Sequence, residues 1–248
     1  MTQLFAVGIA FAVGFATPAA GQGAASLPPE IAVAAPTSAA LARTLAPAEL
    51  MIPLEIDVGR KALLALPSMN EDAKTLETEY PGIWEAVWKA IEPQIRQYVE
   101  EDFPRFWSKL ENLYSSRLTE REAQAILFFY RSPTGQKMLR TMLTGVDPAP
   151  LIAGIANSED STISAEQMRS ATDTARLRVL QSLGPADQEQ LKALMGSISL
   201  DKFRSIGAET QRLTLEWVNE DDPAFDAKVD PLVEAAMEKY IAERSRRR

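Results

Sequence analysis

The side chains in this sequence that could do chemistry are carboxylates, amines and hydroxyls. Its 248 residues include no cysteine and no histidine, which excludes disulfides, thiolate nucleophiles, imidazole bases and the usual zinc and haem ligands. Ser199 and Lys202 have the Ser-x-x-Lys spacing of penicillin-interacting serine enzymes, but no Lys-Thr-Gly strand or second serine element accompanies them. Ser199 is better explained as a helix cap, so we expect no catalytic residue.

The acidic residues do not have the spacing of a metal site. Residues 219–222, Asn-Glu-Asp-Asp, and Asp226 could attract calcium, but they lack the alternating ligands and central glycine of a calcium loop. We expect an exposed turn there, with no metal and no cofactor bound by the chain. The net charge of −8 also argues against a nucleic-acid partner, because the basic residues cluster only at positions 244–248.

The elements that must position these side chains are predicted to be helices. Apolar residues recur in steps of three and four through most of the chain, and no segment shows sustained alternation of β-branched residues. The clearest amphipathic stretch covers residues 81–114, where Pro93 and Pro104 should kink or break the helix. The fold class is therefore all-α, a bundle of amphipathic helices and helical hairpins, with two similar halves as an open alternative.

Aromatic residues are concentrated between Tyr80 and Tyr130. A packed core is the simpler explanation, because small helical domains need the large area that such side chains bury. The alternative is a groove between helices around Trp84, Trp88 and Phe106 that holds an apolar ligand.

Two helix-start signals follow one another after this stretch. Thr119 and Glu122 have the spacing of a capping box, in which each side chain binds the other residue's backbone amide. The helix that they begin ends at Phe129 and Tyr130. Ser132-Pro133 then begins another helix, with serine as the cap and proline at the first helical position.

The order of these residues resembles the signature of a bacterial family, domain of unknown function 2059. The resemblance covers about residues 84–144, and it implies an exported helical protein without assigning any activity or catalytic residue. The matching residues are Leu118-Thr119, Glu122, Phe129-Tyr130, Ser132-Pro133 and Gly135-Gln136-Lys137.

The motif has a structural and a functional interpretation. In the first, it specifies a tight helix-turn-helix in which Gly135 lets the helices approach closely. In the second, Lys137 and Tyr130 hold an anionic ligand near a helix N-terminus, where negative charge is favoured.

A weaker second copy of this pattern is a further hypothesis, covering about residues 165–244. If it is real, two similar helical hairpins should pack together; if not, the match is the chance similarity of amphipathic helices. Without a gap, Leu118, Glu122, Ile126, Ser132, Lys137 and Met138 align with Leu183, Asp187, Leu191, Ser197, Lys202 and Phe203.

The N-terminal residues have the pattern of a secretory signal peptide, residues 1–21. The apolar run Leu4–Ala16 is too short to span a membrane comfortably, and Ala19 and Gly21 suit the positions before a cleavage site. No lysine or arginine precedes the run, so a start upstream of Met1 and a retained membrane anchor are the alternatives.

Two further divisions follow the leader. Residues 22–53 are rich in alanine and proline and are predicted to be a linker with one short helix, Ala39–Leu45, capped by Ser38. Residues 54–248 are predicted to be the helical domain.

These features predict a periplasmic or secreted protein without a transmembrane span after processing. We expect a non-enzymatic helical module that binds an envelope protein, a peptide or a cell-wall component. A carrier or sensor of an apolar small molecule or lipid is the alternative, and the oligomeric state is left open.

Overall fold

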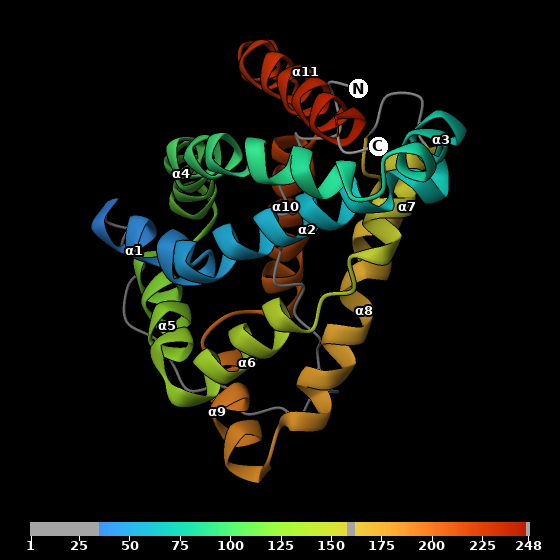
Figure 1. Ribbon diagram of the computed structural model, residues 1–248. Coiled ribbons are helices and arrows are strands. Elements are labelled where there is room, and N and C mark those ends of the chain that lie inside the picture. Colours follow the sequence, from blue (N-terminus) through green and yellow to red (C-terminus); the bar gives the residue numbers. More distant parts are fainter. Residues whose placement is uncertain (1–34, 158–161, 247–248) are drawn as a thin grey trace.

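The computed structural model describes residues 35–157 and 162–246, which are almost entirely helical (Figure 1). No β-strand occurs among these residues, so the all-α prediction is confirmed. None of their helices is both long and apolar enough to cross a membrane. The helices are α1 (Ala35–Leu45), α2 (Ala48–Met69), α3 (Glu71–Glu79), α4 (Ile83–Arg117), α5 (Glu120–Arg131), α6 (Pro133–Thr144), α7 (Ala149–Asn157), α8 (Ala165–Ser182), α9 (Pro185–Met195), α10 (Leu200–Val218) and α11 (Pro223–Ser245).

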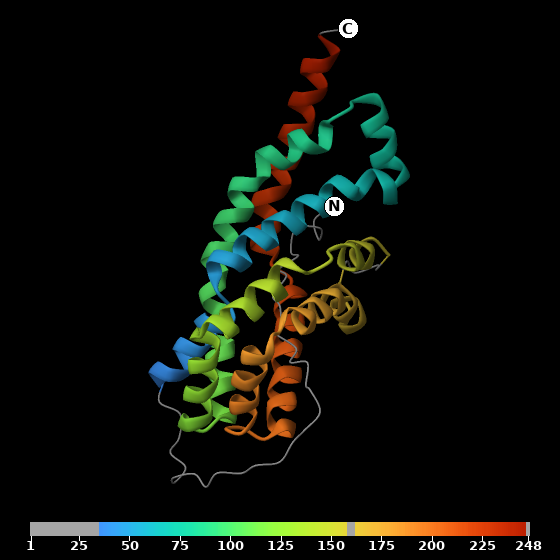
Figure 2. The same ribbon diagram turned by 90° about the horizontal axis from the view of Figure 1, so that it is seen from below.

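The longest helix, α4, is contacted by α1, α2, α3, α10 and α11. It continues through Pro93 and Pro104, so the expected break is absent, although its axis bends along its length (Figures 1 and 2). A proline inside a helix costs about 3 kcal/mol. Each fully buried large apolar side chain contributes about 1.5–3 kcal/mol, and α4 buries 12 residues, so burial outweighs both prolines.

The two halves of α4 belong to two different core clusters. The first half, from Ile83 to Val99, packs with α2, α3 and α11. The second half, from Phe103 to Tyr114, packs with α1, α5, α10 and their neighbours. Figure 2 shows α11 running beside the first half of α4. The single helix therefore connects two apolar cores.

The linker prediction is wrong for residues 35–53, apart from its short helix Ala39–Leu45, which lies within α1. These residues form α1 and the first part of α2, and Leu41, Ala42 and Met51 are completely buried. Small alanine side chains let α1 lie close to α4, which is why the composition resembled that of a linker. Ser38 is a buried residue inside α1, which begins at Ala35, and is therefore not its cap. Residues 22–34 and the predicted leader lie outside the described residues.

The carboxyl group of Glu55 on α2 is buried. It is 3% exposed, and neither carboxyl oxygen has a hydrogen-bond partner among the described residues. Burial, and secondarily the charge of Asp102, raises the pKa of Glu55 well above its ordinary value. Between the two pKa values, the Glu55 carboxyl group is protonated in the folded protein and ionised in the unfolded chain, where its pKa is 4.5.

The variant Glu55→Gln should change how stability depends on pH. With the carboxyl pKa raised in the folded state, the free energy of unfolding falls as pH rises from the unfolded toward the folded pKa. The neutral amide removes this fall, so the variant should match the parent near pH 4 and exceed it by more than about 1 kcal/mol near pH 7 in urea unfolding. Glu49→Gln, an exposed change on the same helix, is the control. Parallel pH profiles for the Glu55 variant and the parent would contradict the assignment.

Candidate functional site

The motif residues build the turn between α5 and α6 as the sequence predicts. The Thr119 hydroxyl accepts a hydrogen bond from the Glu122 amide at 3.3 Å, and the Glu122 carboxylate accepts one from the Thr119 amide at 2.8 Å. The Ser132 hydroxyl accepts from the Gly135 amide at 3.2 Å, with Pro133 at the first position of α6. Both predicted helix starts are confirmed.

Gly135, in the first turn of α6, lies directly against the backbone of the last turn of α5. A Cβ atom at this position would lie 2.2 Å from the Phe129 carbonyl oxygen and 2.5 Å from the Tyr130 Cα. Both contacts are with backbone atoms, which cannot rotate away. The close approach that the motif predicts therefore requires glycine.

Replacing Gly135 by alanine should destabilise the hairpin, because the backbone of α5 or α6 must move to admit the methyl group. We expect a loss of about 1–3 kcal/mol in the free energy of unfolding, measured by urea denaturation. The control is Gly196→Ala, where the nearest contact of an added Cβ is an ordinary 3.4 Å. A Gly135 variant as stable as the control would show that the turn adapts without strain.

The anion that faces Lys137 is a carboxylate of the chain itself. The Lys137 amine lies 2.9 Å from the Asp187 carboxylate and also donates to the Ser182 carbonyl. Hydrogen bonds from Thr134 and then from Lys137 hold the pKa of Asp187 at about 2. Tyr130 is fully buried. Lys137 and Tyr130 therefore do not form the open anion site that the sequence offered as an alternative.

A second lysine–carboxylate ion pair joins the same parts of the chain, with the acid and the base exchanged. The Lys202 amine on α10 lies 2.5 Å from the Glu122 carboxylate on α5. The proposed repeat aligns Glu122 with Asp187 and Lys137 with Lys202, so each hairpin's capping acid pairs with the lysine of the other hairpin. Figure 1 shows α9 beside the α5–α6 hairpin. This reciprocity is what two similar hairpins packed together would produce.

Ser199 and Lys202 have structural functions. The Ser199 hydroxyl caps α10 by accepting a hydrogen bond from the Lys202 amide at 3.3 Å. Since the Lys202 amine pairs with Glu122, the Ser-x-x-Lys pair is a helix cap with a salt bridge.

Trp84, Trp88 and Phe106 do not line a common groove. The two tryptophans belong to one core cluster and Phe106 to the other, and all three are at least 97% buried. Trp84 and Phe106 are 22 residues apart on one helix, a rise of about 33 Å at 1.5 Å per residue. The cavity beside Phe106 is about 20 Å³, enough for about one water molecule.

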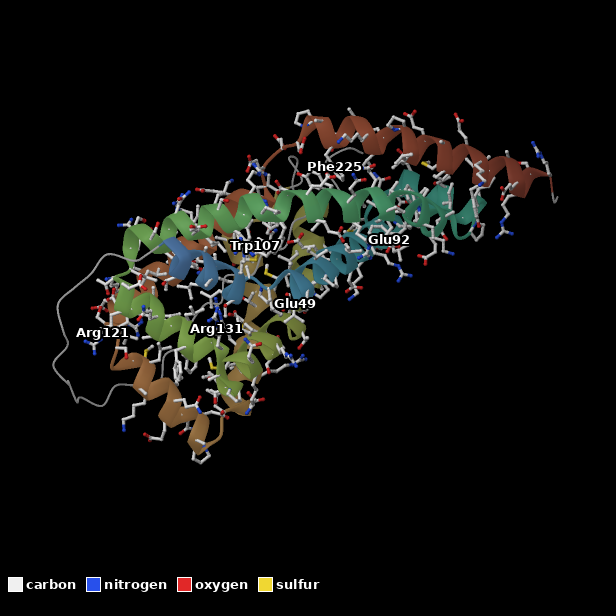
Figure 3. All side chains as sticks on the ribbon, turned by 90° about the vertical axis from the view of Figure 1, so that its left-hand side faces the viewer. Glu49, Glu92, Trp107, Arg121, Arg131 and Phe225 are labelled. Carbon is white, nitrogen blue, oxygen red and sulfur yellow. The ribbon has the colours of Figure 1, made fainter. Side chains whose placement is uncertain are left out.

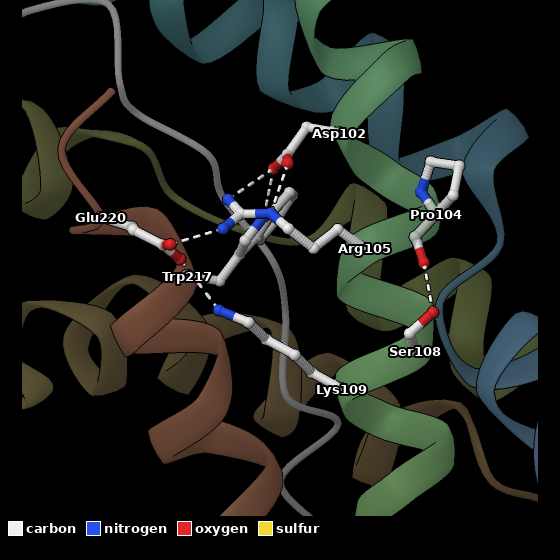
Figure 4. Close-up of polar contacts among 7 residues, drawn as sticks. All are labelled: Asp102, Pro104, Arg105, Ser108, Lys109, Trp217 and Glu220. Atoms are coloured by element: carbon white, nitrogen blue, oxygen red, sulfur yellow. Dashed lines mark hydrogen bonds and ion pairs between the residues drawn. The ribbon is translucent and has the colours of Figure 1, made fainter. Parts of the chain in front are cut away.

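The acidic turn after α10 fastens that helix to α4 (Figure 4). The Glu220 carboxylate accepts hydrogen bonds from Lys109 at 2.8 Å and from Arg105, and the Lys109 bond is the main cause of its lowered pKa. Arg105 also lies 2.6 Å from Asp102, which accepts the Trp217 indole hydrogen bond at 2.5 Å. No group of three or more acidic residues in the described chain could hold a metal ion.

A groove that the sequence analysis missed lies between α1, α2, α5 and α6. It has a volume of about 400 Å³, and Arg43, Arg131 and Arg140 line it together with Glu49. Figure 3 shows this side of the molecule, with Arg131 on α5 and Glu49 on α2. No pattern in the sequence indicates the groove, because its arginines come from three helices whose packing could not be predicted.

Phe128 is a second feature that sequence reasoning did not single out. Its side chain is 81% exposed, the largest exposure of any large apolar residue in the described chain. Arg121 lies on the same side of α5, because seven residues make nearly two helical turns. Arg131 follows one turn after Phe128. The outer face of α5 therefore combines an aromatic ring with positive charge.

Residues 105–146 match the family described as "Uncharacterized protein conserved in bacteria (DUF2059)". The resemblance predicted from the motif is therefore confirmed over this segment, which contains Phe128 and two of the groove arginines. No curated protein and no solved structure matches the chain.

Proposed function

We propose that this chain is an exported, non-enzymatic binding module of the bacterial cell envelope, and that it binds a partner protein with the outer face of α5. Phe128 is the observation that carries the proposal. The Phe128 side chain is 81% exposed to water. Covering it with a partner would stabilise the complex, because burial of apolar surface contributes about 25 cal/mol per Å². Arg121 and Arg131 add positive charge on this face, so the complementary partner surface is an apolar pocket with acidic residues beside it.

The contacts of the motif residues support binding rather than catalysis. Glu122, Lys137, Ser199 and Lys202 have the functional groups that acid–base or nucleophilic chemistry uses. Each is engaged in a cap or an ion pair within the hairpins. These side chains therefore stabilise the hairpins. The outer face of α5 is the surface of the family segment that we assign to binding.

Export is supported by the apolar run Leu4–Ala16 and the small residues that follow it. Cleavage after Gly21 would leave Gln22 as the first residue. Sequencing the N-terminus of the protein recovered from the periplasmic fraction of intact cells should therefore find Gln22. A chain that remains in the cytosol with its leader would contradict export, and a membrane-bound chain with its leader would identify a retained anchor.

The partner surface can be tested by photo-crosslinking in living cells. A photoreactive residue at Gln124, an exposed neighbour of Phe128 on α5, should capture one discrete partner. Phe128→Ala in the same protein should abolish this adduct and change the free energy of unfolding by less than about 0.5 kcal/mol, because the ring is exposed. The positional control is a photoreactive residue at Glu238, exposed on α11. The same adducts from both positions, or capture that persists without Phe128, would contradict the proposal.

A further inference from the structure

We propose that the groove between α1, α2, α5 and α6 is a binding site for an oxyanion, a phosphate or carboxylate group carried by a small molecule. Its volume of about 400 Å³ falls within the usual range for small-molecule sites. Apolar side chains, Leu50 and Leu139, line part of it, so the ligand has space for a small apolar portion beside its charged group.

The charges in the groove favour an anion. Three arginines and one glutamate line the groove, so its charged side chains are mainly positive, although the whole chain has a net charge of −8. Within the described residues, none of these three guanidinium groups forms an ion pair. The planar guanidinium group binds carboxylate and phosphate through two parallel hydrogen bonds. These donors are thus available to a ligand, unlike the amines of Lys137 and Lys202.

Packing holds part of the groove in place. The Arg43 guanidinium lies 5.5 Å from the centre of the Trp107 ring. The Trp107 indole in turn donates a hydrogen bond to the Ala46 carbonyl at 2.8 Å, which fixes the ring beside α1. On α6, the side-chain amide of Gln136 donates a hydrogen bond to the Tyr130 backbone carbonyl at 2.6 Å. One of the three guanidinium donors, that of Arg43, is therefore partly preorganised, which lowers the entropy cost of binding.

The oxyanion site goes beyond the proposed partner surface on α5. The two features share only Arg131, at the end of α5, and Phe128 does not line the groove. Phe128→Ala therefore separates them: it should remove partner capture and leave anion binding unchanged.

The test is a titration of the purified protein with inorganic phosphate and, separately, with glutarate, at constant ionic strength set with sodium chloride. Saturable shifts of backbone amide and arginine Nε–H NMR signals near the groove are expected with at least one anion. The anion that binds more tightly identifies the ligand's charged group as phosphate or carboxylate. Arg140→Gln should weaken binding at least about tenfold, because a charge-assisted hydrogen bond is lost. Glu49→Gln should tighten binding, because it removes the groove's negative charge.

Matched variants separate a site from a general charge effect. Arg178→Gln, an exposed change on α8, alters the net charge as Arg140→Gln does and should leave the affinity unchanged. Glu238→Gln is the corresponding control for Glu49→Gln. Circular dichroism of each variant establishes that it is folded. Absence of saturation with both anions, or equal weakening by the Arg140 and Arg178 variants, would overturn the proposal.

Discussion

Burial of one face of α4 is the constraint on which the rest of the structure depends. Five helices contact this one, and its apolar residues belong to both core clusters. This burial also explains how the helix accommodates Pro93 and Pro104, since two lost backbone hydrogen bonds are a small cost beside that much apolar area. The groove and the α5 face depend on α4 in turn, because α1 packs on α4 and α5 packs on α1 in the same core cluster as the second half of α4.

Polar groups lie where one core cluster gives way to the other. Asp102 and Arg105 on α4 meet Trp217 and Glu220 from the end of α10, and the buried Glu55 on α2 is close enough for the charge of Asp102 to affect its pKa. Hydrogen bonds of this kind require a particular geometry, whereas apolar contacts depend little on direction. The network therefore fixes how α10 is oriented on α4, while the two clusters supply most of the stabilisation.

The parts of the fold that the sequence predicted are those determined within one or two helical turns. The capping box at Thr119, the Ser132-Pro133 start and the need for Gly135 all follow from local geometry and are present in the structure. The helical segment Ala39–Leu45 of α1 was predicted, but its packing on α4 was not, because alanine gives little amphipathic signal even where its small size permits close packing. Pairings between distant segments could not be predicted, since they depend on how the helices pack.

The candidate sites show the same limit. Lys137 was a reasonable ligand-binding residue until the fold placed Asp187 beside it. Nothing in the sequence connects the three groove arginines. They lie around one groove only because α1, α2 and the α5–α6 hairpin come together. Phe128 is part of an aromatic triplet whose other members, Phe129 and Tyr130, are buried. Only the structure distinguishes its outward position.

The crossed salt bridges between the hairpins bear on modularity. Residues 105–146 contain Glu122 and Lys137, but the partners of both, Lys202 and Asp187, come from the later hairpin. If the segment that matches the family model were excised, it would therefore carry an acid and a base without their counter-charges. A substitution that removes one of these charges leaves its counterpart on the other hairpin without this ion pair.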